Sequence, residues 1–345
     1  MRKSIQLLDA TLRDGGQGLE DAFKNNISNS YFPSNIIPRI INLISDSGVD
    51  IIELGAIEYS KEDKKKFAIY QSIEELSKTM PNIRNENQLY AGLYIGPDTP
   101  LNNIPEWNPS LVEGVRVILR YSELEKSLNY CAALSKKGYK VFIQPMLTMR
   151  YTDEELVRVI NSANEMSAYA LYFVDSYGYM QNNDIQRLFD FYNSRLNEDI
   201  RIGFHAHNNM SLAYSNVLNF LNIDTDRMLI IDSCSTGMGQ GAGNLQTELI
   251  IPYLNHKFCK QYKFDPILEI CDILEELFPF DYLWGYSVTR LLPAIYNTAY
   301  KYALIMRHKY NLTFKEINHI LLNMPNDLRS RYTTENVEML VYKYK

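Results

Sequence analysis

Short apolar runs alternate with amphipathic segments along the first three quarters of the chain. The apolar runs are rich in Val, Ile and Leu, which is typical of parallel strands buried on both faces. The segments between them carry apolar residues at helical spacing. Eight strands are predicted in this way, at 5–11, 49–55, 88–95, 114–120, 139–146, 170–176, 200–207 and 227–233. The clearest helices between them are predicted at 35–48, 122–138, 152–166 and 181–196.

This alternation predicts an α/β fold, a (β/α)₈ TIM barrel over residues 1–262. An open doubly wound sheet of the Rossmann type would carry GxGxxG after the first strand, whereas residues 9–18 read DATLRDGGQG. Residues 263–345 show no further strand and predict a helical C-terminal region that serves packing or assembly. Its helices are predicted at 266–278, 290–310, 313–324 and 333–344.

Composition narrows the class of protein without revealing its chemistry. A formal net charge of −6 gives no reason to expect nucleic acid as a partner. No apolar run approaches the roughly 20 residues that span a bilayer, and the N-terminus lacks a signal-peptide pattern. The 4 cysteines are scattered and predict neither disulfides nor a cysteine metal site. We therefore expect a cytoplasmic protein without a membrane partner.

Polar residues cluster at the predicted C-terminal ends of the strands, where barrel enzymes carry their active sites. In the segment FHAHNN, His205 and His207 lie two positions apart, so in a strand both imidazoles share one face. The first strand lies beside the last in a closed barrel, so Asp14 could add a carboxylate. Two imidazoles and a carboxylate suit Mn²⁺ or Mg²⁺, with Fe²⁺, Co²⁺ or Zn²⁺ as alternatives. The same two histidines could also be a hydrogen-bonded pair without a metal.

Three ordered segments resemble the signature of the DRE-TIM metallolyase superfamily, the HMG-CoA lyase-like barrels. They are LLDATLRDGGQ, GFHAHNN and GMGQGAGN, and they begin at residues 7, 203 and 237. The superfamily includes 4-hydroxy-2-oxovalerate aldolases, isopropylmalate and homocitrate synthases, and HMG-CoA lyase. The segments GVDIIELG, GVRVILR and FVDSYG also fall where the second, fourth and sixth strands of that family would place them. The glycine-rich loop at 237–244 looks most like the aldolase branch.

The resemblance implies a divalent-metal-dependent (class II) aldolase or lyase that cleaves or forms a 4-hydroxy-2-oxo acid. The small-molecule substrates would be a 2-oxo acid and an aldehyde, joined through a metal-stabilised enolate of the pyruvate type. Arg13 would supply a permanent positive charge to the enolate oxygen. The implied metal ligands are Asp14, His205, His207 and Asn244. The implied substrate-binding residues are Arg13, Gln17, Glu53, Gln144, Ser176 and Arg290.

Two departures from the aldolase pattern bear on the general acid/base. The aldolases carry a His four residues after the catalytic Arg, and this chain has Gln17 there, as the synthases and HMG-CoA lyase do. Gly16 also stands where many synthases have an acidic residue. The aldolases use a Tyr early in the C-terminal region, and Tyr286 is the local candidate for that catalytic role. Arg290, nearby, could bind an anionic substituent of the substrate.

Two other functions stay open on the sequence. A Claisen-type synthase or lyase of the same superfamily would act on an acyl-CoA, although no Lys/Arg cluster for the CoA phosphates is visible. A non-catalytic barrel subunit could retain the metal site, since the aldolase His is replaced. The C-terminal region departs from the aldolases that work with an aldehyde dehydrogenase, so that partner is not expected. Self-association into a homo-oligomer through the tyrosine-rich C-terminal helices is the expectation instead.

Overall fold

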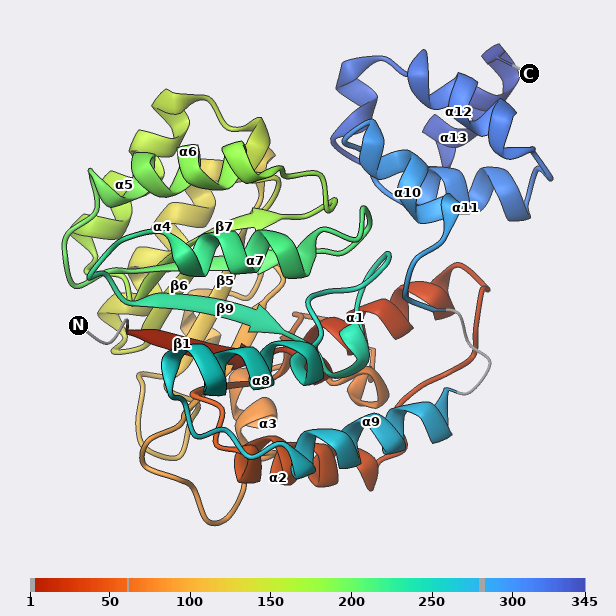
Figure 1. Ribbon diagram of the computed structural model, residues 1–345. Coiled ribbons are helices and arrows are strands. Elements are labelled where there is room, and N and C mark those ends of the chain that lie inside the picture. Colours follow the sequence, from red (N-terminus) through yellow and green to blue (C-terminus); the bar gives the residue numbers. More distant parts are fainter. Residues whose placement is uncertain (1–3, 61, 279–282, 345) are drawn as a thin grey trace.

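The computed structural model describes residues 4–60, 62–278 and 283–344 and shows a closed barrel of parallel strands (Figure 1). The strands pair in the order β1-β9-β8-β7-β6-β5-β4-β2, and β1 also pairs with β2, which closes the sheet. A short extra strand, β3 (Ile69–Tyr70), pairs with the C-terminal end of β2. The barrel strands are β1 (Ile5–Asp9), β2 (Ile51–Ile57), β4 (Leu89–Tyr94), β5 (Gly114–Leu119), β6 (Lys140–Pro145), β7 (Ala170–Asp175), β8 (Arg201–Ala206) and β9 (Leu229–Ser233). The predicted TIM barrel and its eight strands are confirmed.

Helices surround the barrel, and their apolar faces pack on the strands (Figure 1). All four helices that the sequence predicts between the strands are present. The helices of this part are α1 (Thr11–Lys24), α2 (Ile36–Ser47), α3 (Ile73–Ser77), α4 (Leu124–Lys136), α5 (Asp153–Glu165), α6 (Asn182–Asn193), α7 (Ala213–Asn222) and α8 (Thr247–Phe258). Single 3₁₀ turns are η1 (Lys65–Phe67), η2 (Leu101–Asn103), η3 (Tyr121–Glu123), η4 (Thr148–Arg150) and η5 (Ser235–Gly237).

Helix α1 begins at once after β1, where the sequence predicts no helix. Two consecutive glycines lie in this helix, although glycine lowers helix propensity. Their role is close approach: a Cβ on Gly16 would lie 1.9 Å from the carbonyl oxygen of Phe67, and one on Gly15 would lie 2.5 Å from Sδ of Met238. The glycines therefore let the first turns of α1, which carry Arg13 and Asp14, sit deep against the barrel mouth.

We expect the substitution Gly16→Ala to destabilise the fold by about 1–3 kcal/mol, because the added methyl must displace backbone rather than a flexible side chain. Equilibrium unfolding in urea measures this change. Lys24→Ala, at an exposed position of the same helix, is the control and should stay within about 0.5 kcal/mol of the wild type. Equal stability of the two variants would contradict the close-packing role of Gly16.

Beyond α8 the chain is helical, as predicted, and contributes to two cores. Helix α9 (Asp265–Leu277) lies beside α2, and its buried side chains belong to the barrel core (Figure 1). The later helices form a second core, here called the C-terminal cluster. Its elements are α10 (Val288–Ile295), α11 (Lys301–His308), α12 (Phe314–Leu322), η6 (Asn326–Arg329) and α13 (Thr334–Tyr344). The domain boundary at 262 stays a prediction.

The helix predicted over 290–310 is wrong as a single element. The structure has two helices there, α10 and α11, separated by a turn in which Asn297 adopts a left-handed conformation with φ of 49°. Pro293, which lacks a backbone N–H, lies in the last turn of α10. The apolar spacing continues across the turn, and this is why the periodicity alone suggested one helix.

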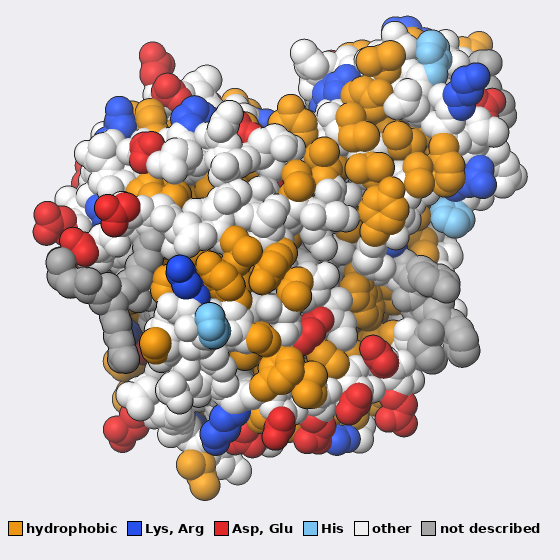
Figure 2. Space-filling view, viewed as in Figure 1, with side chains coloured by type: hydrophobic (Ala, Val, Ile, Leu, Met, Phe, Trp, Pro, Cys, Tyr) orange, Lys and Arg blue, Asp and Glu red, His pale blue; other side chains and the backbone are white. Residues whose placement is uncertain are grey.

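The surface of the C-terminal cluster is rich in hydrophobic side chains on the face shown in Figure 2. Its exposed large residues include Phe314, Leu322, Met339 and Tyr342. Self-association through this region stays a prediction, since one chain does not show what would cover the surface. Among the helices of the described residues, none is both long and apolar enough to cross a bilayer.

Candidate metal centre and active site

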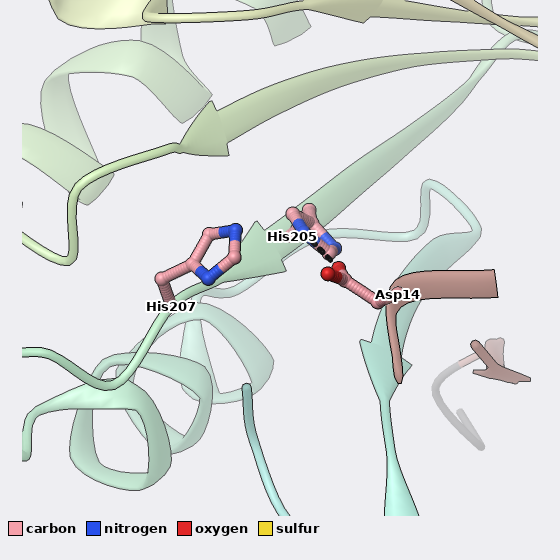
Figure 3. Close-up of side chains that lie close together, drawn as sticks. All are labelled: Asp14, His205 and His207. Atoms are coloured by element: carbon pink, nitrogen blue, oxygen red, sulfur yellow. Dashed lines mark ion pairs between the residues drawn. The ribbon is translucent and has the colours of Figure 1, made fainter. Parts of the chain in front are cut away.

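Three side chains that could hold a metal ion meet at the C-terminal mouth of the barrel (Figure 3). His205 lies in β8, His207 directly after it, and Asp14 in the first turn of α1. One ligand atom from each lies within 4.8 Å of the other two, and Nε2 of His205 is 3.2 Å from Oδ2 of Asp14. The structure thus brings together the three residues that the sequence proposed as a ligand set.

Hydrogen bonds on the far side of both imidazoles orient them toward this point. Nδ1 of His205 lies 2.9 Å from Oδ2 of Asp232, and Nδ1 of His207 lies 3.2 Å from the carbonyl oxygen of Gly243. With those two nitrogens donating, Nε2 of each ring is left as the metal-binding atom. A carboxylate or carbonyl behind a ligating histidine is the usual arrangement, because it fixes the tautomer and the ring plane.

The charge states of the three groups also fit a cation site. Burial lowers the pKa of His207 to about 4, so this imidazole is neutral and can offer a lone pair. Burial alone would raise the pKa of Asp14, but the Arg13 guanidinium and His205 hold it well below its usual range. Burial likewise opposes the charged form of His205, yet its hydrogen bonds to Asp14 and Asp232 raise its pKa. A divalent ion would displace the proton between His205 and Asp14.

Asn244 supplies an independent observation that a ligand belongs here. Its Oδ1 is buried and has no hydrogen-bond partner among the described residues, whereas its Nδ2 donates to the carbonyl oxygen of Met238 at 3.0 Å. Such orphaned buried acceptors are rare and costly unless an ion, water or ligand satisfies them. A backbone bridge pairs Asn244 with His207, and a Cβ on Gly239 would contact both Asn244 and Asp14. The residues present therefore fit a divalent ion held by oxygen and imidazole ligands.

Arg13 lies beside the cluster and is fixed by three hydrogen bonds. Its Nε donates to Oε2 of Glu53 at 2.8 Å, and its Nη1 donates to Oδ2 of Asp14 at 2.9 Å and to Oε1 of Gln17 at 3.3 Å. Burial opposes its charge, but the two carboxylates raise its pKa further, so the guanidinium stays charged at every working pH. Among the buried carboxylates of β1 and β2, Glu53 therefore orients Arg13. Asp9 instead binds Thr11 and Thr247.

A second buried arginine, Arg116, connects the group that holds Arg13 with the group that holds His205. Nη1 of Arg116 donates to the same Oε2 of Glu53 at 2.6 Å, and its Nη2 donates to Oδ2 of Asp232, which also holds His205. We call the path Arg13–Glu53–Arg116–Asp232–His205 the Arg116 bridge. The Arg116 guanidinium lies 4.9 Å from the centre of the Tyr172 ring, and the Tyr172 hydroxyl donates to Asp232 at 3.1 Å. All of these side chains are buried.

Arg116 in β5 and Asp232 in β9 are functional candidates that no motif in the sequence singles out. Gln144 also belongs to this group: in the amide orientation that satisfies its neighbours, its oxygen accepts from Nε and Nη2 of Arg116, both at 3.2 Å. Gln144 thus contacts Arg116 and also lines the cavity in front of the candidate metal ligands.

That cavity has a volume of about 170 Å³ and two unlike sides. One side is polar and carries the candidate metal ligands Asp14, His205 and His207, and the other side is an apolar wall. Ser176 lies at the rim, where its Oγ accepts the backbone N–H of Leu147 at 2.9 Å. The polar side is formed by Arg13, Asp14, Gln17, Gln144, Ser176, Tyr177, His205, His207 and Gln240, and the apolar wall by Leu93, Ile118, Met146, Leu147 and Val174.

Two predicted site residues lie elsewhere. Tyr286 is 63% exposed and does not line this cavity, so the geometry does not support it as the catalytic acid/base. Arg290 lines a different cavity, of about 350 Å³, between α1 and the C-terminal cluster. Its Nη1 donates to the carbonyl oxygens of Trp284 and Gly285. Residues 284–285 do reach the loop after β9, where Nε1 of Trp284 donates to the carbonyl oxygen of Thr236 and the N–H of Gly285 donates to that of Ala242. The side chains of Tyr286 and Arg290 nevertheless lie outside the cavity at the metal ligands.

Fold and site together define a TIM barrel with a His₂–carboxylate cluster and a buried arginine at its C-terminal mouth. Residues 118–274 match the HMGL-like family model. The chain is 26% identical over 263 residues to a 4-hydroxy-2-oxovalerate aldolase of Geobacillus genomosp. 3, covering 74% of this chain and 71% of that protein. It is 23% identical over 252 residues to an oxaloacetate decarboxylase of Mycobacterium tuberculosis, covering 73% and 70%. The structure of a Bacillus subtilis HMG-CoA lyase has the same fold, with a TM-score of 0.61 at 17% identity over 80% of this chain and 94% of that one.

The resemblance to the DRE-TIM metallolyase superfamily is therefore confirmed, since residues 118–274 match the HMGL-like family model and several curated relatives are named 4-hydroxy-2-oxovalerate aldolase. The predicted enzyme class, a carbon–carbon lyase, is confirmed with it.

Proposed function

We propose that the protein is a divalent-metal-dependent aldolase that cleaves or forms a 4-hydroxy-2-oxo acid. The observation that carries this proposal is the convergence of Asp14, His205, His207 and Arg13 on one small cavity with an apolar wall. The polar side suits the carboxylate and keto oxygens of a 2-oxo acid. The apolar wall suits an uncharged aldehyde, because the described residues that form it include no cation.

A divalent ion such as Mn²⁺ or Mg²⁺ would be held by Asp14, His205 and His207, with Oδ1 of Asn244 near, and would supply Lewis-acid stabilisation of an enolate oxygen. The protein's own contribution is a set of fixed charges. Arg13 presents a permanent cation to the same oxygen and costs no reorganisation, since Glu53 and Asp14 already hold it. The Ser176 hydroxyl hydrogen and the Gln17 and Gln144 amides remain to orient the substrate carboxylate.

We expect Arg13→Gln to lower kcat by about 10²-fold, the usual effect of removing one donor to a developing oxyanion. Substrate KM should change less, because the polar groups that hold the ground state remain. Steady-state kinetics with manganese measures both constants. Arg158→Gln, which alters an exposed arginine paired with Glu125, is the control. A kcat within a factor of about two of the wild type in the Arg13 variant would remove Arg13 from the mechanism.

The assay that tests the function follows release of a 2-oxo acid from a series of 4-hydroxy-2-oxo acids, with and without Mn²⁺. Acetyl-CoA with 2-oxo acids forms the second arm, and thiol release there would favour the Claisen-type alternative. Equal residual lyase activity in the wild type, Arg13→Ala and His205→Ala would support the non-catalytic barrel subunit.

One observation favours a second reaction at the same site, the decarboxylation of a 2-oxo acid that carries a carboxylate on C3. Aldol cleavage needs a base for the 4-hydroxyl, and Gln17 cannot supply one. Apart from the candidate metal ligands and Arg13, the titratable side chains among the described cavity residues reduce to Tyr177, whose hydroxyl donates to Ser330. Decarboxylation needs no such base, and the relative from Mycobacterium tuberculosis is named an oxaloacetate decarboxylase. Measuring CO₂ release from oxaloacetate, corrected for manganese alone, tests it, and a rate equal to the metal background would exclude it.

A further inference from the structure

A second polar cavity lies where the C-terminal cluster meets the barrel. Its volume is about 320 Å³, and it lies between η4 and the segment after β7 on the barrel side and the end of α10 and η6 on the cluster side. The polar side chains that line it are Arg150, Tyr179, Tyr296, Asn297, Asn326 and Arg329. It is separate from the candidate active site, and the proposed reaction does not use it.

This cavity holds two guanidinium groups and, among its described lining residues, no carboxylate. Arg329 donates to the carbonyl oxygens of Tyr296 at 2.6 Å, Leu321 at 3.1 Å and Met324 at 3.2 and 3.1 Å. Arg150 donates from Nη2 to the carbonyl oxygen of Asn297 at 2.8 Å. Neither arginine forms an ion pair within the described ranges, whereas the buried Arg13 and Arg116 each pair with two carboxylates.

Arg150 is the less satisfied of the two. Its Nε is buried and has no hydrogen-bond partner in the part of the chain that the structure describes. Burial lowers the pKa of Arg150, and the like charge of Arg329 acts in the same direction. Because an arginine stays protonated, it must carry its charge here without a counter-ion, which is unfavourable in a partly buried position.

We propose that this cavity is a binding site for a small oxyanion, a phosphate or a carboxylate, held between Arg150 and Arg329. A guanidinium can donate to two oxygens of such an anion in parallel, and this geometry makes arginine the preferred residue for phosphate and carboxylate recognition. Arg150 donates one hydrogen bond to the described residues and so keeps N–H groups for the anion, whereas Arg329, which already makes four, would contribute mainly its charge. Asn326 and Tyr179 line the same space, and an amide and a hydroxyl are groups that can complete the contacts to an anion. The anion would neutralise the two charges and join the C-terminal cluster to the barrel.

The oxyanion site lies next to the candidate active site. A narrow space of about 10 Å³ between them is lined by Arg150 and Asn297 and also by Leu147, Ser176 and Tyr177, which line the catalytic cavity as well. The oxyanion therefore has two sources, a free anion or an anionic group at the far end of a substrate. The chemistry is the same for both, and competition with the substrate separates them.

Inorganic phosphate is the probe for the first test. Thermal unfolding and isothermal titration calorimetry are followed with increasing phosphate at constant ionic strength, set with sodium chloride. The wild type should be stabilised by phosphate, and Arg150→Gln should bind it roughly tenfold more weakly or worse, since a charge-assisted contact is lost. Arg187→Gln, on the exposed face of α6, makes the same change of charge and should behave as the wild type. An equal phosphate response in the two variants would overturn the proposal.

A second variant keeps the test informative if Arg150→Gln folds poorly. Asn326→Asp places a carboxylate in the cavity, so it should raise the melting temperature without phosphate and remove most of the phosphate response. An unchanged phosphate response in Asn326→Asp would overturn the site. Where the site is present, a phosphate-dependent rise in substrate KM identifies the anion as part of a substrate, and an unchanged KM identifies a free anion.

Discussion

Replacing Asp14 by Asn is expected to remove metal binding and to lower lyase activity by at least about 10³-fold, since a bound cation supplies several kcal/mol of transition-state stabilisation. The substitution keeps the shape of the side chain but removes its charge. It also turns an acceptor that faces Arg13 and His205 into an amide that can satisfy only one of them. Loss of the carboxylate therefore removes one metal ligand and also weakens the hydrogen bond that holds Arg13 in place. The electron paramagnetic resonance signal of free Mn²⁺ reports binding independently of activity.

The matched control is Asp9→Asn. Asp9 is the last residue of β1, five positions before Asp14. Asp9 is equally buried, but it contacts Thr11 and Thr247 rather than the metal cluster. Burial raises the pKa of Asp9 to about 6, whereas that of Asp14 is held well below its usual range, so removing the charge costs less at Asp9 than at Asp14. Manganese affinity should be retained in Asp9→Asn and lost in Asp14→Asn. Equal manganese affinity in the two variants would show that the ion, if bound, lies elsewhere.

The sequence predicted the barrel because its strands are buried on both faces and therefore read as continuous apolar runs. It also predicted that Asp14, His205 and His207 would meet, because the two histidines share a strand face by simple alternation and β1 pairs with β9 in the closed barrel. These inferences need only the period of a strand and the closure of a sheet.

Contacts that depend on angles around the barrel were beyond such reasoning. Arg116 on β5 meets Asp232 on β9 across the interior, and neither residue is near the other along the sheet order. The periodicity of a strand predicts which side chains point inward, but it does not predict which of them meet across the barrel. The glycines of α1 are a similar case, since their neighbours Phe67 and Met238 are far away in sequence. Tyr286 was misplaced because no pattern gives the path of a chain after its last strand.

The Arg116 bridge provides the second large effect. We expect Arg116→Met to destabilise the protein by about 3–5 kcal/mol, because it leaves Glu53 and Asp232 buried with one charge partner removed. The same change should weaken manganese binding about 10–100-fold, since Asp232 then holds His205 less firmly. Urea unfolding measures the first effect and manganese titration the second.

Arg116→Lys separates charge from geometry. A lysine restores a cation between the two carboxylates, but its single ammonium cannot reproduce the planar fork that reaches Glu53 from Nη1 and Asp232 from Nη2. We therefore expect it to recover much of the unfolding free energy and little of the manganese affinity. Arg158→Met, at an exposed ion pair with Glu125, should change stability by less than about 1 kcal/mol. If Arg116→Met binds manganese as the wild type does, Arg116 is only a structural counter-ion, and the two halves of the site are positioned independently.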